Sequence, residues 1–92
     1  MNIVFRIHAL RRMAQRHISQ SEVRYVVETG AVLEEYPEDR PFPSHLILGW
    51  VRDRPLHVVA AKDAVSQETV IVTVYEPDTA KWSGDFRTRR AL

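Results

Sequence analysis

Apolar positions in the first thirty residues recur with the period of a helix. Over residues 6–16 they gather on one side of a helical wheel. These positions are Ile7, Leu10, Met13 and Ala14. A second helix is expected to begin after Ser19, because Glu22 follows it at the spacing of a capping box. Gly30 stands where the C-terminal cap of that helix belongs.

The period changes after Gly30, and runs of β-branched and other apolar residues predict strands. The expected strands are residues 31–36, 46–51, 56–62 and 69–75. Short loops join the last three, which favours an antiparallel meander. Residues 2–5 are either a short strand or an extended lead-in. A last helix is expected to start at Asp78 and to end in the basic run 87–90.

This order predicts an α+β fold with two N-terminal helices, a four-stranded antiparallel sheet and a C-terminal helix. Residues 1–92 are expected to form a single domain. Hydrophobic residues make up 45% of the chain and charged residues 27%, values typical of globular proteins. No apolar run is long enough to span a membrane, and the first residues carry no signal-peptide pattern. Together with the lack of cysteine, these features predict a soluble cytoplasmic protein.

Charge is distributed unevenly along the chain. Thirteen basic residues, eleven of them arginine, face twelve acidic ones, for a net charge of +1. Residues 1–17 carry +4, residues 28–40 carry −4 and residues 81–92 carry +3. Arginine forks onto phosphate and stacks on bases, so the basic ends indicate an anionic partner. The alternative is an ordinary solvated surface with internal ion pairs.

His8, Arg12 and Arg16 are spaced by four and share the helix side opposite the apolar one. Two further polar candidates, His57 and Tyr75, lie on predicted strands. RNA cleavage without a metal needs a base, an acid and cations beside the phosphate, and these residue types supply all three. The alternatives are a solvated helix face, a half-buried structural histidine, and a tyrosine in the core or at its rim. The hairpin register, which decides whether the two histidines meet, stays open.

Metal and cofactor sites are not expected. The chain has no cysteine, and no two histidines have the spacing of a helical metal site. Its three glycines are isolated, so no phosphate-cradling loop is predicted.

Four blocks of the chain resemble a small bacterial domain family of unknown function. They are residues 8–19, residues 35–41 with 43–44, residues 54–59, and residues 73–78 with Trp82. Members of that family often stand beside a zinc-finger antitoxin of the YgiT type, and their layout is similar to RelE- and MqsR-like mRNA interferases. The resemblance implies a toxin of a type II toxin–antitoxin system that cleaves mRNA, free or on the ribosome. It also implies a cognate zinc-finger or helix-turn-helix antitoxin as partner.

Carried over by position, the implied catalytic residues are His8, Arg12, Arg16, His57 and Tyr75. The further basic residues expected to contact RNA are Arg11, Lys62, Arg87, Arg89 and Arg90. The chain has only two lysines, so histidine and arginine would replace the lysines of RelE-like sites. This difference favours an alternative function, a non-catalytic module that binds RNA or protein. A homodimer paired through an exposed strand is a third interpretation.

Overall fold

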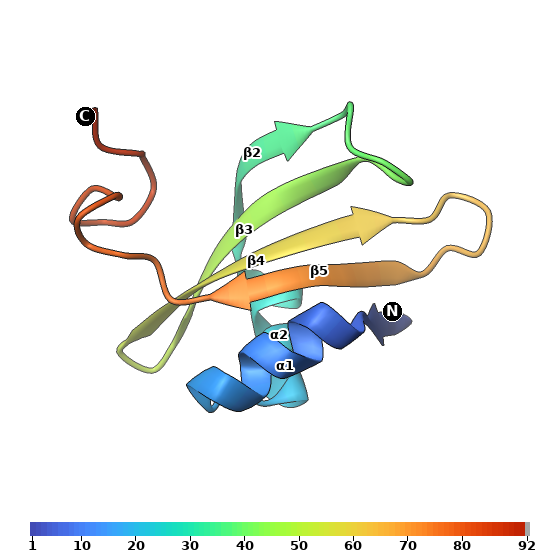
Figure 1. Ribbon diagram of the computed structural model, residues 1–92, viewed down its shortest axis with the longest axis horizontal. Coiled ribbons are helices and arrows are strands. Elements are labelled where there is room, and N and C mark those ends of the chain that lie inside the picture. Colours follow the sequence, from blue (N-terminus) through green and yellow to red (C-terminus); the bar gives the residue numbers. More distant parts are fainter. Residues whose placement is uncertain (92) are drawn as a thin grey trace.

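The computed structural model, which describes residues 1–91, has two short helices on one face of a five-stranded sheet (Figure 1). Helix α1 spans Ile7–Arg16 and helix α2 spans Gln20–Thr29. Both predicted N-terminal helices are therefore confirmed. Their end groups explain the bounds: Ser19 and Glu22 form both hydrogen bonds of the capping box at α2. His17 ends α1 in the left-handed conformation, with φ of 56°.

The sheet is mixed and has the strand order β1-β5-β4-β3-β2. Its strands are β1 Ile3–Phe5, β2 Ala31–Tyr36, β3 Ser44–Val51, β4 Arg54–Lys62 and β5 Thr69–Tyr75. Strands β2 to β5 form the antiparallel meander, but β1 adds a fifth strand that runs parallel to β5. The prediction of a four-stranded antiparallel sheet is therefore wrong. A three-residue strand carries too little alternation to be separated from a lead-in by pattern alone.

The main core lies between the helices and the lower sheet face in Figure 1. Its fully buried side chains come from both helices and from β3, β4 and β5. They include Ala9, Met13, Val23, Val26, Leu56, Val58, Ile71 and Val74. Strict alternation along β5 predicts that Ile71 lies on the same sheet face as Tyr75. A register shift in the β4–β5 pair next to Val59 turns Ile71 to the other face, where it is part of this core.

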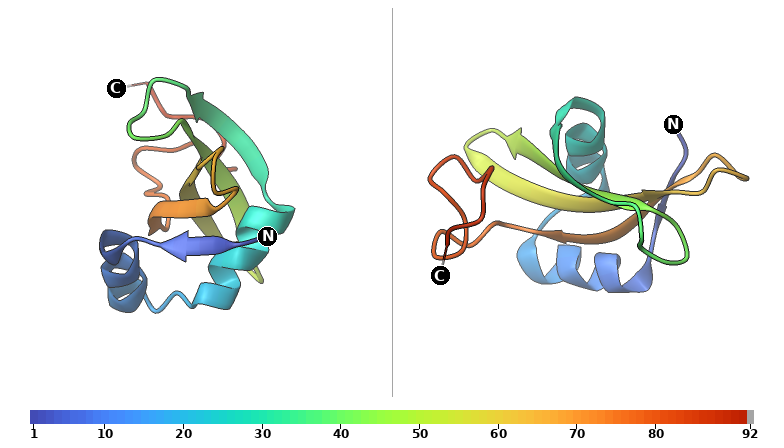
Figure 2. Two further views of the ribbon diagram at one scale, coloured as in Figure 1. Left: turned by 90° about the vertical axis from the view of Figure 1, so that its right-hand side faces the viewer. Right: turned by 90° about the horizontal axis from the view of Figure 1, so that it is seen from above.

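The opposite sheet face is covered at one end by the C-terminal segment, residues 76–91 (Figure 2). The helix predicted to start at Asp78 is wrong, because this segment contains turns and one isolated bridge within the described residues. Asp78 does cap a single turn, in which its carbonyl accepts from the amides of Lys81 and Trp82 at 3.0 Å. The chain then reverses, and an antiparallel bridge joins Trp82 to Arg89.

Candidate functional site

His57 and Tyr75 are direct partners in the β4–β5 pairing, and the structure brings their side chains together. The Nδ1 atom of His57 lies 3.2 Å from the Tyr75 hydroxyl, and its Nε2 atom lies 2.9 Å from the Phe86 carbonyl oxygen. A carbonyl only accepts, so Nε2 carries the proton and Nδ1 accepts from the Tyr75 hydroxyl. The imidazole is completely buried, and this burial lowers its pKa. His57 is therefore neutral at pH 7.

The C-terminal segment forms a roof over this pair. Trp82 is buried and stands edge-on to His57, with ring centroids 4.4 Å apart. The Arg89 guanidinium carbon lies 4.8 Å from the centroid of the Trp82 ring. This cation–π contact holds a positive charge at the edge of the roof.

A cleft of about 720 Å³ opens beside Tyr75. Its charged walls come from two parts of the chain, the end of α1 and the C-terminal segment that follows β5. The charged side chains are Arg16, Glu76, Asp78, Lys81 and Arg89. Burial raises the pKa of Tyr75, so its hydroxyl stays protonated at neutral pH. The cleft therefore places a neutral phenol among three cations, which suits a phosphate-containing ligand.

Arg54 fixes the position of Arg16 and was missed by the sequence analysis. Its guanidinium donates to the backbone carbonyls of Arg16 and of His17, the latter at 3.0 Å. Its Nε atom also pairs with Glu76 at 2.5 Å. Arg54 thus ties the C-terminal end of α1 to the end of β5. Arg54 is the first residue of β4 and begins one of the four resembling blocks, but neither feature identifies these partners.

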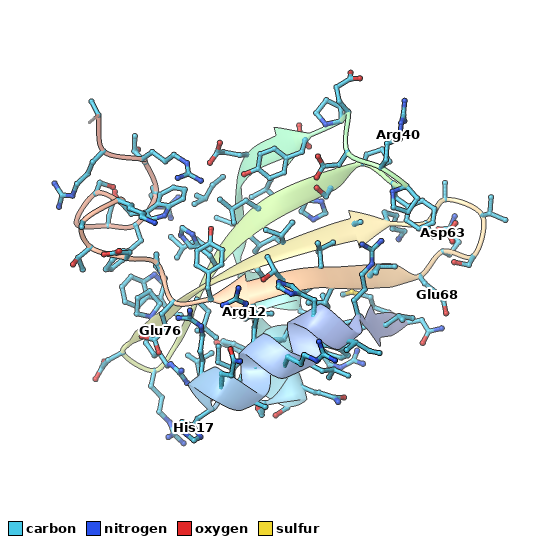
Figure 3. All side chains as sticks on the ribbon, in the orientation of Figure 1. Arg12, His17, Arg40, Asp63, Glu68 and Glu76 are labelled. Atoms are coloured by element: carbon cyan, nitrogen blue, oxygen red, sulfur yellow. The ribbon has the colours of Figure 1, made fainter. Side chains whose placement is uncertain are left out.

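The other two residues of the helix stripe lie outside the cleft. His8 and Arg12 are exposed on α1 (Figure 3 labels Arg12), and neither lines the cleft. With a rise of 1.5 Å per residue, His8 is about 12 Å from Arg16 along the helix axis. Arg16, His57 and Tyr75 are therefore the predicted catalytic residues that the structure brings together.

The residues predicted to contact RNA are dispersed. Arg89 lines the cleft together with Lys81, which the sequence analysis did not select. Arg87 lines a different pocket, and Arg90 donates to the Thr79 carbonyl at 2.9 Å. Lys62 ends β4, five residues from His57 and so about 16 Å along the strand. Arg11 is exposed on α1 outside the cleft.

Residues 1–91 hold no group of three histidine, aspartate or glutamate side chains arranged as metal ligands. Over the same residues, neither helix is long and apolar enough to cross a membrane.

Fold and site together define a small protein in which two helices cover one face of a mixed sheet. Its tyrosine-containing cleft lies where the ends of α1 and β5 meet the C-terminal segment, and it has three basic and two acidic side chains. The chain belongs to the family described as Domain of unknown function (DUF4258), whose model matches residues 5–76. Comparisons with curated proteins and with solved structures gave no match. The matched range contains Arg16, His57 and Tyr75, whereas Lys81, Trp82 and Arg89 follow it.

Proposed function

We propose that this protein binds RNA in the Tyr75 cleft and cleaves it without a metal ion. The observation that carries the proposal is that Arg16, Lys81 and Arg89 line the same cleft as Tyr75, where they outnumber its two carboxylates. The Tyr75 hydroxyl is itself hydrogen-bonded to buried His57. Cleavage by the 2′-hydroxyl passes through a phosphorane with increased negative charge. Arg16, Lys81 and Arg89 would stabilise that charge in the cleft.

The hydrogen-bond directions give Tyr75 and His57 a joint role as the base. While the Tyr75 hydroxyl donates to Nδ1 of His57, its oxygen can accept from the 2′-hydroxyl of the RNA. The 2′-hydroxyl proton then passes to Tyr75 as the Tyr75 proton passes to His57. The lowered pKa of His57 keeps the imidazole unprotonated before the reaction. As the bond between phosphorus and the 5′-oxygen breaks, the proton would return from His57 through Tyr75 to that leaving oxygen, so that His57 is neutral again.

The proposal extends to a toxin–antitoxin pair, and this part rests on the four sequence blocks that resemble the antitoxin-associated family. The substrate would be mRNA in the cytoplasm, free or on the ribosome. The antitoxin, a zinc-finger or helix-turn-helix protein, would cover the cleft with acidic residues, because complementary charge favours that contact.

Cleavage of a long RNA, free and ribosome-bound, by the purified chain in excess EDTA tests the proposal. We expect mapped cuts that fall at least 100-fold in Arg16→Ala and in Tyr75→Phe. Arg40→Ala is the matched control, because it removes the same charge from an exposed position outside the cleft. Cuts that persist in both cleft variants would refute the site, and a folded protein that makes no cuts would refute the activity.

A second candidate function is RNA binding without cleavage. The burial of His57 favours it, because both ring nitrogens already have partners and no imidazole is open to the cleft. This function predicts RNA affinity that falls with salt, a slope reduced by Arg16→Ala, and intact RNA.

A further inference from the structure

A second pocket is lined in part by Arg87 of the C-terminal segment and has no residue in common with the cleft. Its volume is about 290 Å³. Tyr25 of α2 and Trp50 of β3 form its aromatic walls, and Arg87 contributes a positive charge. The backbone around Gly30 and Gly49 completes the lining.

The two aromatic side chains are unusually exposed for their size. Tyr25 is 52% exposed and Trp50 is 45% exposed. Large aromatic residues are more often buried, so two of them at one hollow indicate a binding surface. The Trp50 ring is held in place by an edge contact with Phe86, with centroids 5.9 Å apart. A fixed, exposed ring is a suitable platform for another flat ring.

Packing against α2 restricts both glycine positions. A Cβ atom on Gly30 would lie 2.6 Å from the carbonyl oxygens of Val26 and Leu48. A Cβ atom on Gly49 would lie 2.8 Å from the Val26 side chain. Neither position admits a side chain without movement of its neighbours, so the two glycines let α2 pack closely on β3. This close packing brings Tyr25 of α2 to the same hollow as Trp50 of β3.

The strand register relates the pocket to the cleft. Leu48, His57 and Tyr75 lie side by side on three neighbouring strands. Leu48 lines the pocket and Tyr75 lines the cleft, so two inter-strand spacings, about 10 Å, separate them. Arg87 lines the pocket and Arg89 lines the cleft, and both belong to the same short stretch of chain. One nucleic-acid strand lying across this stretch can reach both.

We propose that the Tyr25–Trp50 pocket binds a nucleobase of single-stranded RNA, while a neighbouring phosphate of that strand occupies the cleft. The base stacks on the exposed aromatic rings, and Arg87 contacts the adjoining phosphate. The choice of RNA rests on the proposed function, but base binding here does not require cleavage. Stacking accepts every base, so the pocket selects unpaired strands over duplexes.

Titration of the ¹⁵N-labelled intact chain with adenosine, cytidine and inorganic phosphate tests the pocket. The protein has two tryptophans, and Trp50→Phe assigns their indole N–H signals. We expect the nucleosides to shift the Trp50 signal and the amide signals of Gly30 and Gly49. Phosphate should shift Trp82 instead. The Val65 amide is the control, because Val65 lies in the loop between β4 and β5 and its side chain is 96% exposed. Figure 3 labels the two ends of this loop, Asp63 and Glu68. If the nucleosides shift the Trp50 indole signal no more than they shift the Val65 amide signal, the proposal is overturned.

Affinity for a labelled single-stranded RNA supplies the second measurement. Loss of one stacked base predicts a decrease of about 5- to 100-fold for Trp50→Ala. Trp50→Phe should retain most of the affinity, and Val65→Ala should change nothing. The two proposals fail separately: nucleoside binding at Trp50 without RNA cleavage refutes the nuclease and supports the pocket. Cleavage that is lost in Arg16→Ala, with no response at Trp50 and unchanged affinity in Trp50→Ala, supports the nuclease and refutes the pocket.

Discussion

Replacement of His57 by alanine tests whether this residue holds the C-terminal segment on the sheet. His57 is completely buried, donates to the Phe86 carbonyl and accepts from the Tyr75 hydroxyl. Each hydrogen bond contributes about 1 kcal/mol. The edge contacts of its ring with Trp82 and Tyr75 add about 0.5–1.5 kcal/mol each. We therefore expect His57→Ala to lower the free energy of unfolding by about 3–5 kcal/mol.

Urea unfolding followed by tryptophan fluorescence measures this loss. Trp82 is buried and Trp50 is already half exposed, so the change in emission reports mainly on the roof over His57. Tyr75→Phe removes one hydroxyl and should cost only about 1 kcal/mol. If His57→Ala does not fold, His57→Gln gives the intermediate case, because an amide keeps one donor for the Phe86 carbonyl.

The size of the loss decides the argument. A domain of this size has a total stability of about 5–15 kcal/mol, so a loss of 3–5 kcal/mol is easily measured. A loss for His57→Ala below about 1 kcal/mol, the range of an ordinary surface substitution, would refute the role assigned to this side chain.

Three further predictions concern pH and packing. Burial holds the pKa of His57 below its ordinary value, so the unfolded chain binds its proton more readily; stability from this group is full above about pH 6.5 and is lost as the pH falls toward the folded-state pKa. Urea midpoints at pH 7.5 and 5.5 should therefore differ in the wild type and much less in His57→Gln, and a wild-type midpoint that rises on acidification would contradict this. Ser19→Ala removes the capping-box hydrogen bond to the Glu22 amide and should lower stability by about 1 kcal/mol in thermal unfolding. Gly30→Ala should cost clearly more than Ser19→Ala in the same assay, because its Cβ meets backbone atoms at 2.6 Å; equal losses would show that the backbone yields cheaply.

The helices could be predicted from the sequence because their signals are local. The apolar period indicates where α1 and α2 lie, and the Ser19 capping box sets where α2 begins. The face predicted for α1 is mostly wrong, because Ile7, Leu10 and Ala14 are exposed and Ala9 is buried with Met13. The C-terminal helix was predicted from the same kind of signal and is absent from the described residues. There, side chains bond to nearby backbone instead: Asp85 accepts from the Arg87 amide at 3.1 Å, and Ser83 accepts from the Thr88 amide at 3.2 Å. Such bonds compete with a helix, and their outcome depends on tertiary contacts.

The candidate site was only partly predictable, for a related reason. Arg16, His57 and Tyr75 could be named by residue type, but their meeting depends on the β4–β5 register and on the docking of α1. No local sequence pattern determines either of them. For the register this matters greatly, because a shift of one residue turns every side chain of a strand to the other face. His8 was grouped with Arg16 on one side of α1. The cleft, however, lies at the C-terminal end of this helix, next to Arg16, and His8 is near the N-terminal end.

The candidate site is formed partly by residues that match the family model and partly by residues that follow the match. The part that matches the family supplies the sheet face, with His57 and Tyr75 paired across two strands. Residues after the match supply the roof, because Trp82 closes over His57 and Arg89 lines the cleft. The same segment supplies Arg87 to the aromatic pocket. The chemistry proposed for the His57–Tyr75 pair would thus belong to the family-matched core, and the segment after it would select the ligands that reach the pair. A change in residues 82–89 should therefore alter ligand choice more readily than it alters the sheet beneath.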